Sequence, residues 1–330
     1  MTPFFLSLLL GFLPMMFNAV WVYWLDRYEQ EPKRLLGYVF LWGAFIAAAG
    51  AYFFNSVWEA GFYILTSSEK LSSLSTAIFS APLVEEFLKG LAVLFVFLLC
   101  RAEFDSILDG IVYAAVTALG FAATENSLYI YEQGYLNGGY SGLLALTFIR
   151  VVIVGWQHPF YTSFIGIGLA FSRLTRSSFW KVSAPILGFS LAVFTHSMHN
   201  LISSVYPSFQ TCLVGTIIDW TGWLAMFLFV LYMIARERQI LEQHLEEEIL
   251  LGTITQAQFQ KALSFSHRVF DPLVSLFSKR HPIVHRFYQL CGELAHKKAQ
   301  AQLASDRVDY PAIIEAYRVE LSKISRQLSG

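Results

Sequence analysis

Seven segments of the chain are long and apolar enough to cross a lipid bilayer as helices, because each holds about 20 mainly apolar residues. They lie at residues 3–24, 35–57, 74–100, 110–131, 143–171, 184–205 and 212–235. The fifth is long and contains Pro159, which predicts a kink or tilt in that helix. The sequence therefore predicts an all-α, polytopic membrane helix bundle with seven spans, or eight if the fifth segment is split at the proline.

Composition separates this bundle from a soluble tail. The chain is 55% hydrophobic and 14% charged, whereas soluble domains have about 45–50% apolar and about 25% charged residues. Residues 239–330 hold 21 charged side chains in 92 positions, against 26 in the first 238. We expect a transmembrane domain at 1–238 and a cytoplasmic helical tail at 239–330. A net charge of −1 does not favour nucleic-acid binding.

Lys and Arg in alternate loops predict the orientation of the chain. One set of loops, with the segment after the seventh span, holds nine basic residues, and the other set holds only Lys70. Because basic loops stay in the cytoplasm, we expect a multi-pass protein of the plasma or inner membrane with its N-terminus outside. In the tail, Thr255 to Gln258 has the form of a capping box, Gly252 ends the preceding helix, and further helices are predicted near 283–304 and 311–328.

The predicted spans contain polar groups that hydrocarbon excludes. Each charge at a helix centre costs at least about 2.5–3.5 kcal/mol on insertion scales, so such groups are expected to face inward and to meet one another or water. Glu85 and Lys89 are four residues apart on one helix face, and Glu86 lies about 100° around the helix from Glu85. The other groups are Glu125, Asn126, Arg150, His158, His196, His199, Asn200 and Asp219.

This set of residue types favours hydrolysis. A carboxylate beside a histidine can take a proton from water and produce hydroxide for attack on a carbonyl. Two histidines and a glutamate could instead hold a divalent ion such as zinc with an open position for water. A nearby Asn or Lys could donate to the resulting oxyanion. The spacing does not match HExxH, so the sequence leaves the metal-bound and metal-free mechanisms open.

Several blocks of these residues, in this order, resemble the PrsW family of intramembrane proteases, which is related in kind to the glutamate-dependent CAAX-processing and bacteriocin-immunity membrane proteases. The resemblance covers about residues 20–205. Two departures are Ala114 and Ala118, where glycines are usual, and His199, where an apolar or aromatic residue is common. The matching blocks are Asp26 to Pro32, the EExxK motif from Glu85 to Lys89, Phe104 to Asn126, Arg150 with His158, and the HxxxN motif from His196 to Asn200.

The resemblance implies an intramembrane endopeptidase that cuts membrane-anchored proteins, including anti-sigma factors, and in which paired glutamates are essential. We assign Glu85 as general base and Glu86 as its partner or a metal ligand, an order that could be reversed. With His158 and His196, Glu86 forms the candidate metal set. Glu125 and Asn200 complete the expected catalytic group, although Asn200 could equally be an interhelical hydrogen-bonding residue. Supporting residues are Lys89, Asn126, Arg150 and His199.

Two other functions stay open on the sequence: a proton-coupled transporter, and a non-enzymatic membrane stress sensor whose tail binds a cytoplasmic partner. Intramembrane Glu and His chains also carry protons, but no inverted repeat is visible in the sequence. Other acidic residues are expected to be structural. Asp26, Glu29 and Glu31 should form a solvated loop face, Asp109 should cap a helix, and Asp219 should lie at the membrane interface.

Overall fold

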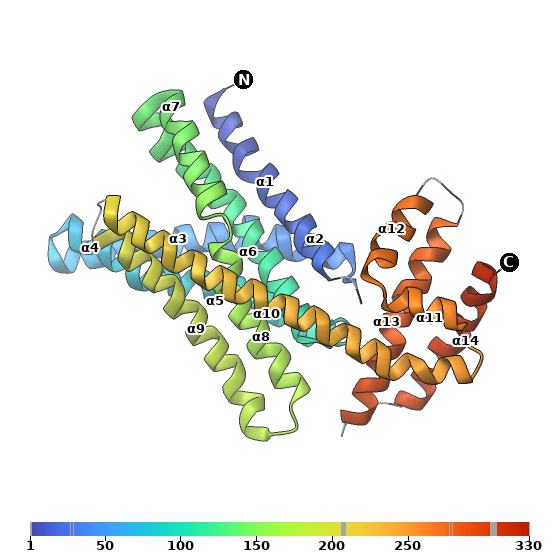
Figure 1. Ribbon diagram of the computed structural model, residues 1–330. Coiled ribbons are helices and arrows are strands. Elements are labelled where there is room, and N and C mark those ends of the chain that lie inside the picture. Colours follow the sequence, from blue (N-terminus) through green and yellow to red (C-terminus); the bar gives the residue numbers. More distant parts are fainter. Residues whose placement is uncertain are drawn as a thin grey trace. The chain divides into compact units, whose positions relative to one another are not determined.

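The computed structural model describes residues 2–26, 28, 30–205, 209–276, 278, 280–303 and 309–329, and within them every regular element is a helix (Figure 1). Short π-helical stretches, η1 (Trp42–Ala47), η2 (Thr76–Ser80), η4 (Ile130–Tyr135) and η5 (Phe148–Ile153), join longer helices, and η3 (Arg101–Glu103) is a 3-10 turn. The α-helices are α1 (Pro3–Leu25), α2 (Lys33–Leu41), α3 (Ala48–Thr66), α4 (Glu69–Ser75), α5 (Ala81–Leu99), α6 (Ile107–Tyr129), α7 (Leu136–Thr147), α8 (Gln157–Leu174), α9 (Ser178–Val205), α10 (Phe209–Leu250), α11 (Gln256–Leu263), α12 (Phe265–Ser275), α13 (His281–Leu303) and α14 (Tyr310–Ser329).

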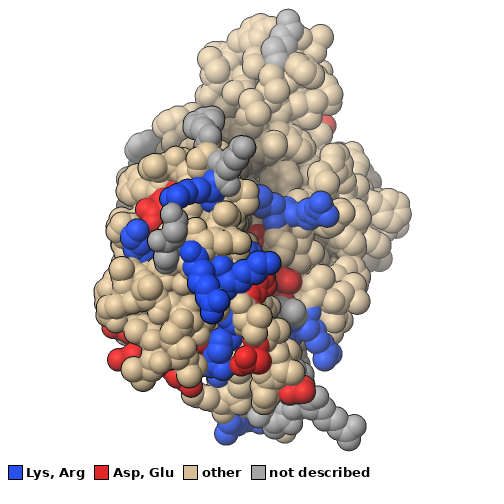
Figure 2. Space-filling view, turned by 90° about the vertical axis from the view of Figure 1, so that its right-hand side faces the viewer, with Lys and Arg blue, Asp and Glu red and all other residues tan. Residues whose placement is uncertain are grey.

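The prediction of an all-α membrane protein is confirmed. Among the described residues, five helical runs are long and apolar enough to cross a bilayer: Pro3–Leu25, Lys33–Thr66, Ile107–Leu174, Ser178–Ser204 and Leu213–Leu250. The helix α5 falls outside this set because three of its 19 residues are charged. Charged side chains gather in one part of the face seen in Figure 2, and the rest of that face is almost uniformly uncharged. Such a surface suits a protein surrounded largely by hydrocarbon.

The fifth predicted span is interrupted rather than continuous. Its first part ends with η5 at Ile153, residues 154–156 leave the helical form, and α8 begins at Gln157. Pro159 is the third residue of α8, inside the first turn, where a proline removes no helical hydrogen bond. The interruption therefore lies before the proline and not at it.

A helical hairpin precedes this interruption. Gly139, with φ +60°, lies inside α7 near its start and reverses the chain there, in a conformation that side chains bearing a Cβ rarely adopt. The two arms then pack closely, since a Cβ atom on Gly142 would lie 2.4 Å from the carbonyl oxygen of Gly134. The predicted loop between the fourth and fifth spans is consequently helical on both sides of a single glycine turn.

The chain divides into two compact units. The first is Met1–Val22 with Glu31–Phe229, and the second is Tyr23–Gln30 with Val230–Gly330. The boundary near Val230 lies a few residues before the predicted boundary at 238, because α10 runs without a break from the bundle into the tail. The segment Tyr23–Gln30, directly after α1, also belongs to the second unit.

In the first unit, α6 is the central helix, and nearly all of its side chains are buried. It packs against α2, η1, α5 and α8. Glycines bring the backbones together: a Cβ atom on Gly166 of α8 would lie 1.9 Å from the carbonyl oxygen of Gly110, and one on Gly120 would lie 2.0 Å from that of Phe40. Such small residues let membrane helices approach closely, and they fix α8 against α6 where the candidate site residues lie.

The start of α6 is held by a capping box. Ser106 is the N-cap and accepts from the Asp109 backbone N–H at 3.2 Å, while the Asp109 carboxylate accepts from the Ser106 N–H at 2.6 Å. Asp109 thus stands at the third helical position rather than at the cap itself. The nearby loop differs from expectation more strongly. Asp26 and Glu31 are buried, and Glu31 accepts a hydrogen bond from the Tyr113 hydroxyl, so the predicted solvated face is wrong for both.

In the second unit, α11 to α14 and the end of α10 enclose a separate hydrophobic core. Leu241 and Leu245 of α10 lie fully inside it, with Tyr28 from the N-terminal segment. The predicted capping box is confirmed, with Thr255 and Gln258 bonded to each other's backbone N–H groups. Gly252 has φ +70° just after α10 ends. Arg27 and Glu29 lie outside the described residues.

Candidate active site

One helix supplies three charged residues to the middle of the bundle. Along α5, Lys89 follows Glu86 by three residues and Glu85 by four, so all three side chains share one side of the helix. The Lys89 ammonium donates to Glu86 Oε1 at 2.6 Å and lies 3.8 Å from Glu85 Oε2. All three residues are buried, and Lys89 also lies over the Phe121 ring. An apolar helix therefore carries a compensated charge cluster into the interior.

The first histidine comes from α9. His196 Nδ1 lies 3.0 Å from Glu86 Oε1, and its Nε2 lies 3.9 Å from Glu85 Oε2. Because a carboxylate only accepts, the Nδ1–H donates to Glu86 and the lone pair remains on Nε2. The ring stacks on Tyr161 of α8 with centroids 4.8 Å apart. His196 is thus oriented with its free nitrogen toward Glu85.

The second histidine stands near the start of α8. His158 Nε2 lies 2.8 Å from Glu125 Oε2, and its Nδ1 lies 3.2 Å from the Lys89 ammonium. An ammonium group only donates, so Nδ1 accepts and the Nε2–H donates to Glu125. The rings of His158 and His196 meet edge to face, with centroids 5.2 Å apart. Each histidine therefore has a carboxylate on one ring nitrogen. The other nitrogen faces Lys89 in His158 and Glu85 in His196.

The charge of Glu125 is compensated by η5. Arg150 donates to Glu125 Oε2 and, through Nε, to Asn126 Oδ1 at 2.9 Å. Its guanidinium also covers the Tyr129 ring, 4.3 Å from the ring centroid. The interruption after Ile153 lets this arginine and His158 approach Glu125 from two separate helices. The whole cluster holds three carboxylates against two permanent cations, so one negative charge is in excess.

Glu85 is the member of the cluster with an open position. Its Oε2 atom is buried and has no hydrogen-bond partner among the described residues, whereas both oxygens of Glu86 are used, Oε2 by the Thr162 hydroxyl at 2.8 Å. A buried carboxylate oxygen without a partner is costly. It points to a proton, a water molecule or a metal ion as the missing partner.

A divalent metal ion fits this donor set. Glu85, His158 and His196 each offer one ligand atom, and these atoms lie within 4.8 Å of one another. Two histidines and a glutamate form a donor set of catalytic zinc sites, and a carboxylate on the second ring nitrogen is the usual support of a ligating histidine. The sequence-based metal set had Glu86 in place of Glu85. Glu86 Oε1 instead lies 3.0 Å from His196 Nδ1.

The structure brings together most, but not all, of the residues expected at the site. Asn200 donates to the backbone oxygen of Ala77 at 2.8 Å and so ties α9 to η2. His199 Nδ1 lies 2.9 Å from Asp219 Oδ2, in a neighbouring polar group that also includes Gln157. The residues that share the main cluster are Glu85, Glu86, Lys89, Glu125, Asn126, Arg150, His158 and His196.

Three contributors were missed by sequence reasoning. Thr162 binds Glu86, Tyr161 stacks on His196, and Gln157 donates to Asp219 at 2.5 Å. All three belong to α8 and lie within four residues of His158. For Tyr161 and Thr162 the signal available in the sequence was their spacing, since residues three and four positions from an inward-facing residue share its helix face. Gln157, next to His158, had no such signal.

Comparison with known proteins identifies relatives over the bundle. Residues 31–235 match the family model described as PrsW family intramembrane metalloprotease. The chain is 29% identical to Protease PrsW of Oceanobacillus iheyensis over 163 residues, which are 49% of this chain and 67% of the relative. It is 38% identical to Protease PrsW of Geobacillus kaustophilus over 112 residues, 33% of this chain and 45% of that relative.

Over 125 residues the chain is 34% identical to Protease PrsW of Clostridioides difficile, covering 38% of this chain and 50% of the relative. The chain thus spans about half the length of two of these three relatives. No solved structure matches it significantly. The family match covers well over half of the chain and includes every residue of the charge cluster, so this membrane protein belongs to the PrsW family.

Proposed function

We propose that the chain is an intramembrane endopeptidase that hydrolyses a peptide bond in a membrane-anchored protein, with Glu85 as the general base. Membership of a family of intramembrane proteases supports the peptidase activity. One observation carries the choice of Glu85: its buried Oε2 has no hydrogen-bond partner and lies 3.9 Å from the lone pair of His196 Nε2. A water molecule near both atoms would have an acceptor for its proton.

Each neighbouring residue has a role in this scheme. Glu85 takes the proton of the attacking water, the hydroxide adds to the scissile carbonyl, and Glu85 returns the proton to the amine nitrogen as the C–N bond breaks. The Lys89 ammonium, 3.8 Å from Glu85, is the nearest donor for the oxyanion that forms. Glu86 and Glu125 hold the two histidines in fixed tautomers through hydrogen bonds at 3.0 and 2.8 Å. Preorganised charge of this kind is effective because the cluster is buried.

A divalent ion, if this member of the family uses one, would be held by Glu85, His158 and His196. When bound, such an ion polarises the carbonyl and makes water more acidic. Lys89 must then move, because its ammonium now contacts the Nδ1 lone pair of His158 at 3.2 Å. The family description as metalloprotease and the donor set both support this version.

We also propose a topology and a substrate class. The excess of basic residues in one set of loops supports an N-terminus outside the cell and a cytoplasmic tail. The substrate is a membrane-anchored regulatory protein of the anti-sigma-factor type, with its scissile segment entering the bundle from the bilayer. The tail would then be placed to meet a cytoplasmic partner.

The test compares new protein termini in membranes from cells that produce the wild type or Glu85→Gln. The substitution keeps the size of the side chain and removes the base, so we expect the termini that depend on the wild type to disappear. Glu132→Gln is the matched control, because Glu132 is exposed in η4. Termini produced equally by the Glu85→Gln variant would reject Glu85 as the base, and no wild-type-dependent terminus at all would reject the peptidase.

Metal analysis of the purified protein separates the two versions of the mechanism. About one divalent ion per chain in the wild type, lost in a His158→Ala/His196→Ala variant, supports the metal-bound version. A metal-free preparation that still cleaves supports direct action of Glu85. The variants' thermal unfolding in detergent shows whether the bundle is intact in each case.

A further inference from the structure

The helix α12 of the second unit presents most of its apolar side chains outward, together with Ser266 and His267, and turns Arg268 and Asp271 inward. Val274 is 83% exposed and Phe270 is 60% exposed, although α12 belongs to a folded helical tail. In contrast, Arg268 of the same helix is only 4% exposed. The exposed apolar residues on this helix and directly after it are Phe265, Phe270, Leu273, Val274 and Leu276.

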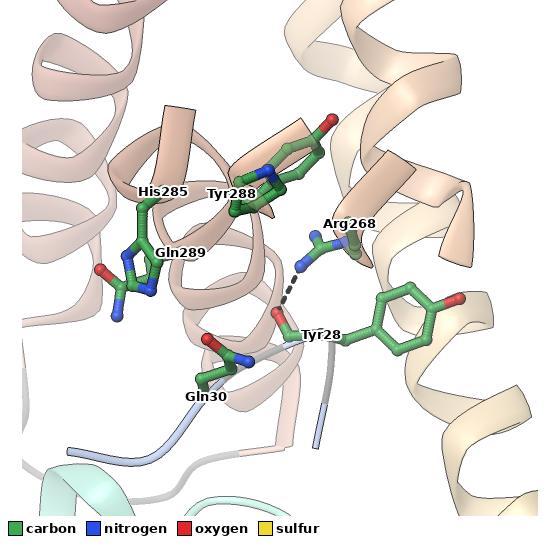
Figure 3. A pocket seen from close by; sticks show the side chains of 7 residues that line it. Tyr28, Gln30, Arg268, His285, Tyr288 and Gln289 are labelled. Carbon is green, nitrogen blue, oxygen red and sulfur yellow. Dashed lines mark hydrogen bonds between the residues drawn. The ribbon is translucent and has the colours of Figure 1, made fainter. Parts of the chain in front are cut away.

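The inward side of α12 is fixed by polar contacts. Arg268 donates from Nε to the Ala262 carbonyl at 2.6 Å and from Nη1 to the Tyr28 carbonyl at 2.9 Å (Figure 3). Asp271 accepts from the Tyr288 hydroxyl at 2.5 Å. Turning the helix to bury Phe270 would break all three hydrogen bonds. The outward apolar face is therefore a fixed property of the folded tail.

The same contacts place α12 close to the membrane surface. Tyr28 is only three residues beyond Leu25, the last residue of the spanning helix α1. An extended chain covers at most about 3.6 Å per residue, so Tyr28 lies within roughly 11 Å of the end of α1. Arg268 is bonded to Tyr28, and both belong to the same compact unit. The start of α12 is thus tethered close to the end of α1.

Charge at the ends of the helix suits a lipid surface. Lys261 precedes α12 and Arg280 follows it, and both are exposed. The two charged side chains within α12, Arg268 and Asp271, are turned toward the tail. An apolar face flanked by basic residues is typical of helices that lie in the bilayer interface and are drawn to anionic lipids.

We propose that α12 is an interfacial helix that docks the tail onto the leaflet where α1 ends, with Phe270 and Val274 inserted among the lipid chains. The proximity to α1 favours lipid over a soluble protein as the occupant of this face. The proposal depends only on membrane embedding and stands apart from the peptidase chemistry. It predicts that the tail is a peripheral membrane element and not a freely tumbling domain.

The test measures the depth of a fluorophore at position 274. The full chain carries Val274→Cys with Cys100→Ser and Cys212→Ser, while buried Cys291 is retained. It is labelled with an environment-sensitive dye and reconstituted at less than one copy per vesicle in phosphatidylcholine–phosphatidylglycerol vesicles. The control is Val319→Cys on α14, which is 63% exposed and apolar in the same tail.

We expect the dye at 274 to be quenched by nitroxides on the lipid chains and to be several-fold less sensitive to aqueous iodide than the dye at 319. Equal iodide quenching at both positions, without lipid quenching, would overturn the proposal. Protection at 274 that appears only at high protein-to-lipid ratios would overturn it as well, because a second copy would then cover the face. Unlabelled Cys291 in each preparation verifies that the tail is folded.

Discussion

The two adjacent glutamates of α5 differ in their partners and not in their burial. Glu86 is bonded at both oxygens, and Glu85 contacts the same lysine and histidine only at 3.8 and 3.9 Å. The 100° turn between neighbouring helix residues predicts that they cannot bind one partner equally well. The sequence could not decide which of them is satisfied, because Thr162 of α8 makes the difference and its register against α5 depends on tertiary packing.

Removing the charge of Glu86 tests its supporting role. In the metal-bound version of the proposed mechanism, Glu86→Gln deprives His196 of the carboxylate that orients its Nδ1–H, so metal affinity should fall by about 10–100-fold, as for other supporting carboxylates. The measurement is competition with a chelator at defined free zinc, with Glu132→Gln as the control. An unchanged affinity would mean that Glu86 does not act through His196.

The reactivity of the Cys291 thiol shows whether the core of the tail is closed. Burial raises its pKa from 9.0 to about 12, so the thiolate that reacts with alkylating reagents is absent at pH 8. We expect no labelling of Cys291 in the folded protein at pH 8, while half-buried Cys100 reacts slowly. Because the folded pKa is the higher one, this contribution to stability is complete below pH 9 and is lost as the pH rises toward 12. Rapid labelling at pH 8 would contradict a closed core.

At the scale of elements, hydropathy located the helices but did not indicate the residues at which they are interrupted. The tail helices begin and end near the residues predicted, because caps and glycines are local signals. The break at residues 154–156 lies close to Pro159, from which a kink was predicted, but the π-helical stretches have no such signal. One of them, η4, contains Gly134, which packs closely against Gly142 of α7, and such tertiary contacts are not visible in hydropathy. A run of apolar residues indicates that a segment is buried in lipid or in protein. It does not indicate the residue at which the helix is interrupted.

The contact between α6 and α8 makes a sharp prediction. Gly166→Ala would place a Cβ atom 1.9 Å from the backbone oxygen of Gly110, so the helices must separate. We expect a loss of about 1–3 kcal/mol in stability and a larger loss of activity, since His158 on the same helix would leave Glu125. Gly61→Ala is the control, because nothing lies within 4 Å of a Cβ there. Thermal unfolding in detergent and the cleavage assay measure both effects, and equal results for the two variants would contradict the packing.

For the whole molecule, Tyr28 constrains the number of membrane crossings. It lies after the first span, yet it is buried in the core formed by residues after the last one. Both ends of the bundle must therefore emerge on one side of the membrane, which requires an even number of crossings between residues 30 and 230. With α1 included the total is odd, which favours seven spans over eight. The alternation of basic loops in the sequence indicates the same parity.

Replacing Tyr28 should release the tail from this segment. Tyr28→Ala removes a ring that packs in the core. The guanidinium carbon of Arg268 lies over this ring, 4.9 Å from the ring centroid. Truncation of a buried aromatic costs about 3–5 kcal/mol. We expect Cys291 to become reactive and the tail to become protease-sensitive, while the bundle still inserts. Tyr38→Ala is the control, since Tyr38 is 68% exposed. An equally protected Cys291 in both variants would show that Tyr28 is dispensable.

The burial of Tyr28 also has a consequence for biosynthesis. Its segment leaves the ribosome long before the helices that enclose it, so the tail cannot complete its core until every intervening span has been inserted. A chain with one span inverted would leave the segment and the tail on opposite sides of the membrane, with a gap in the core where the tyrosine belongs. Completion of the tail core therefore depends on correct insertion of every span. A misinserted chain would have an incompletely folded tail, which quality-control proteases can degrade.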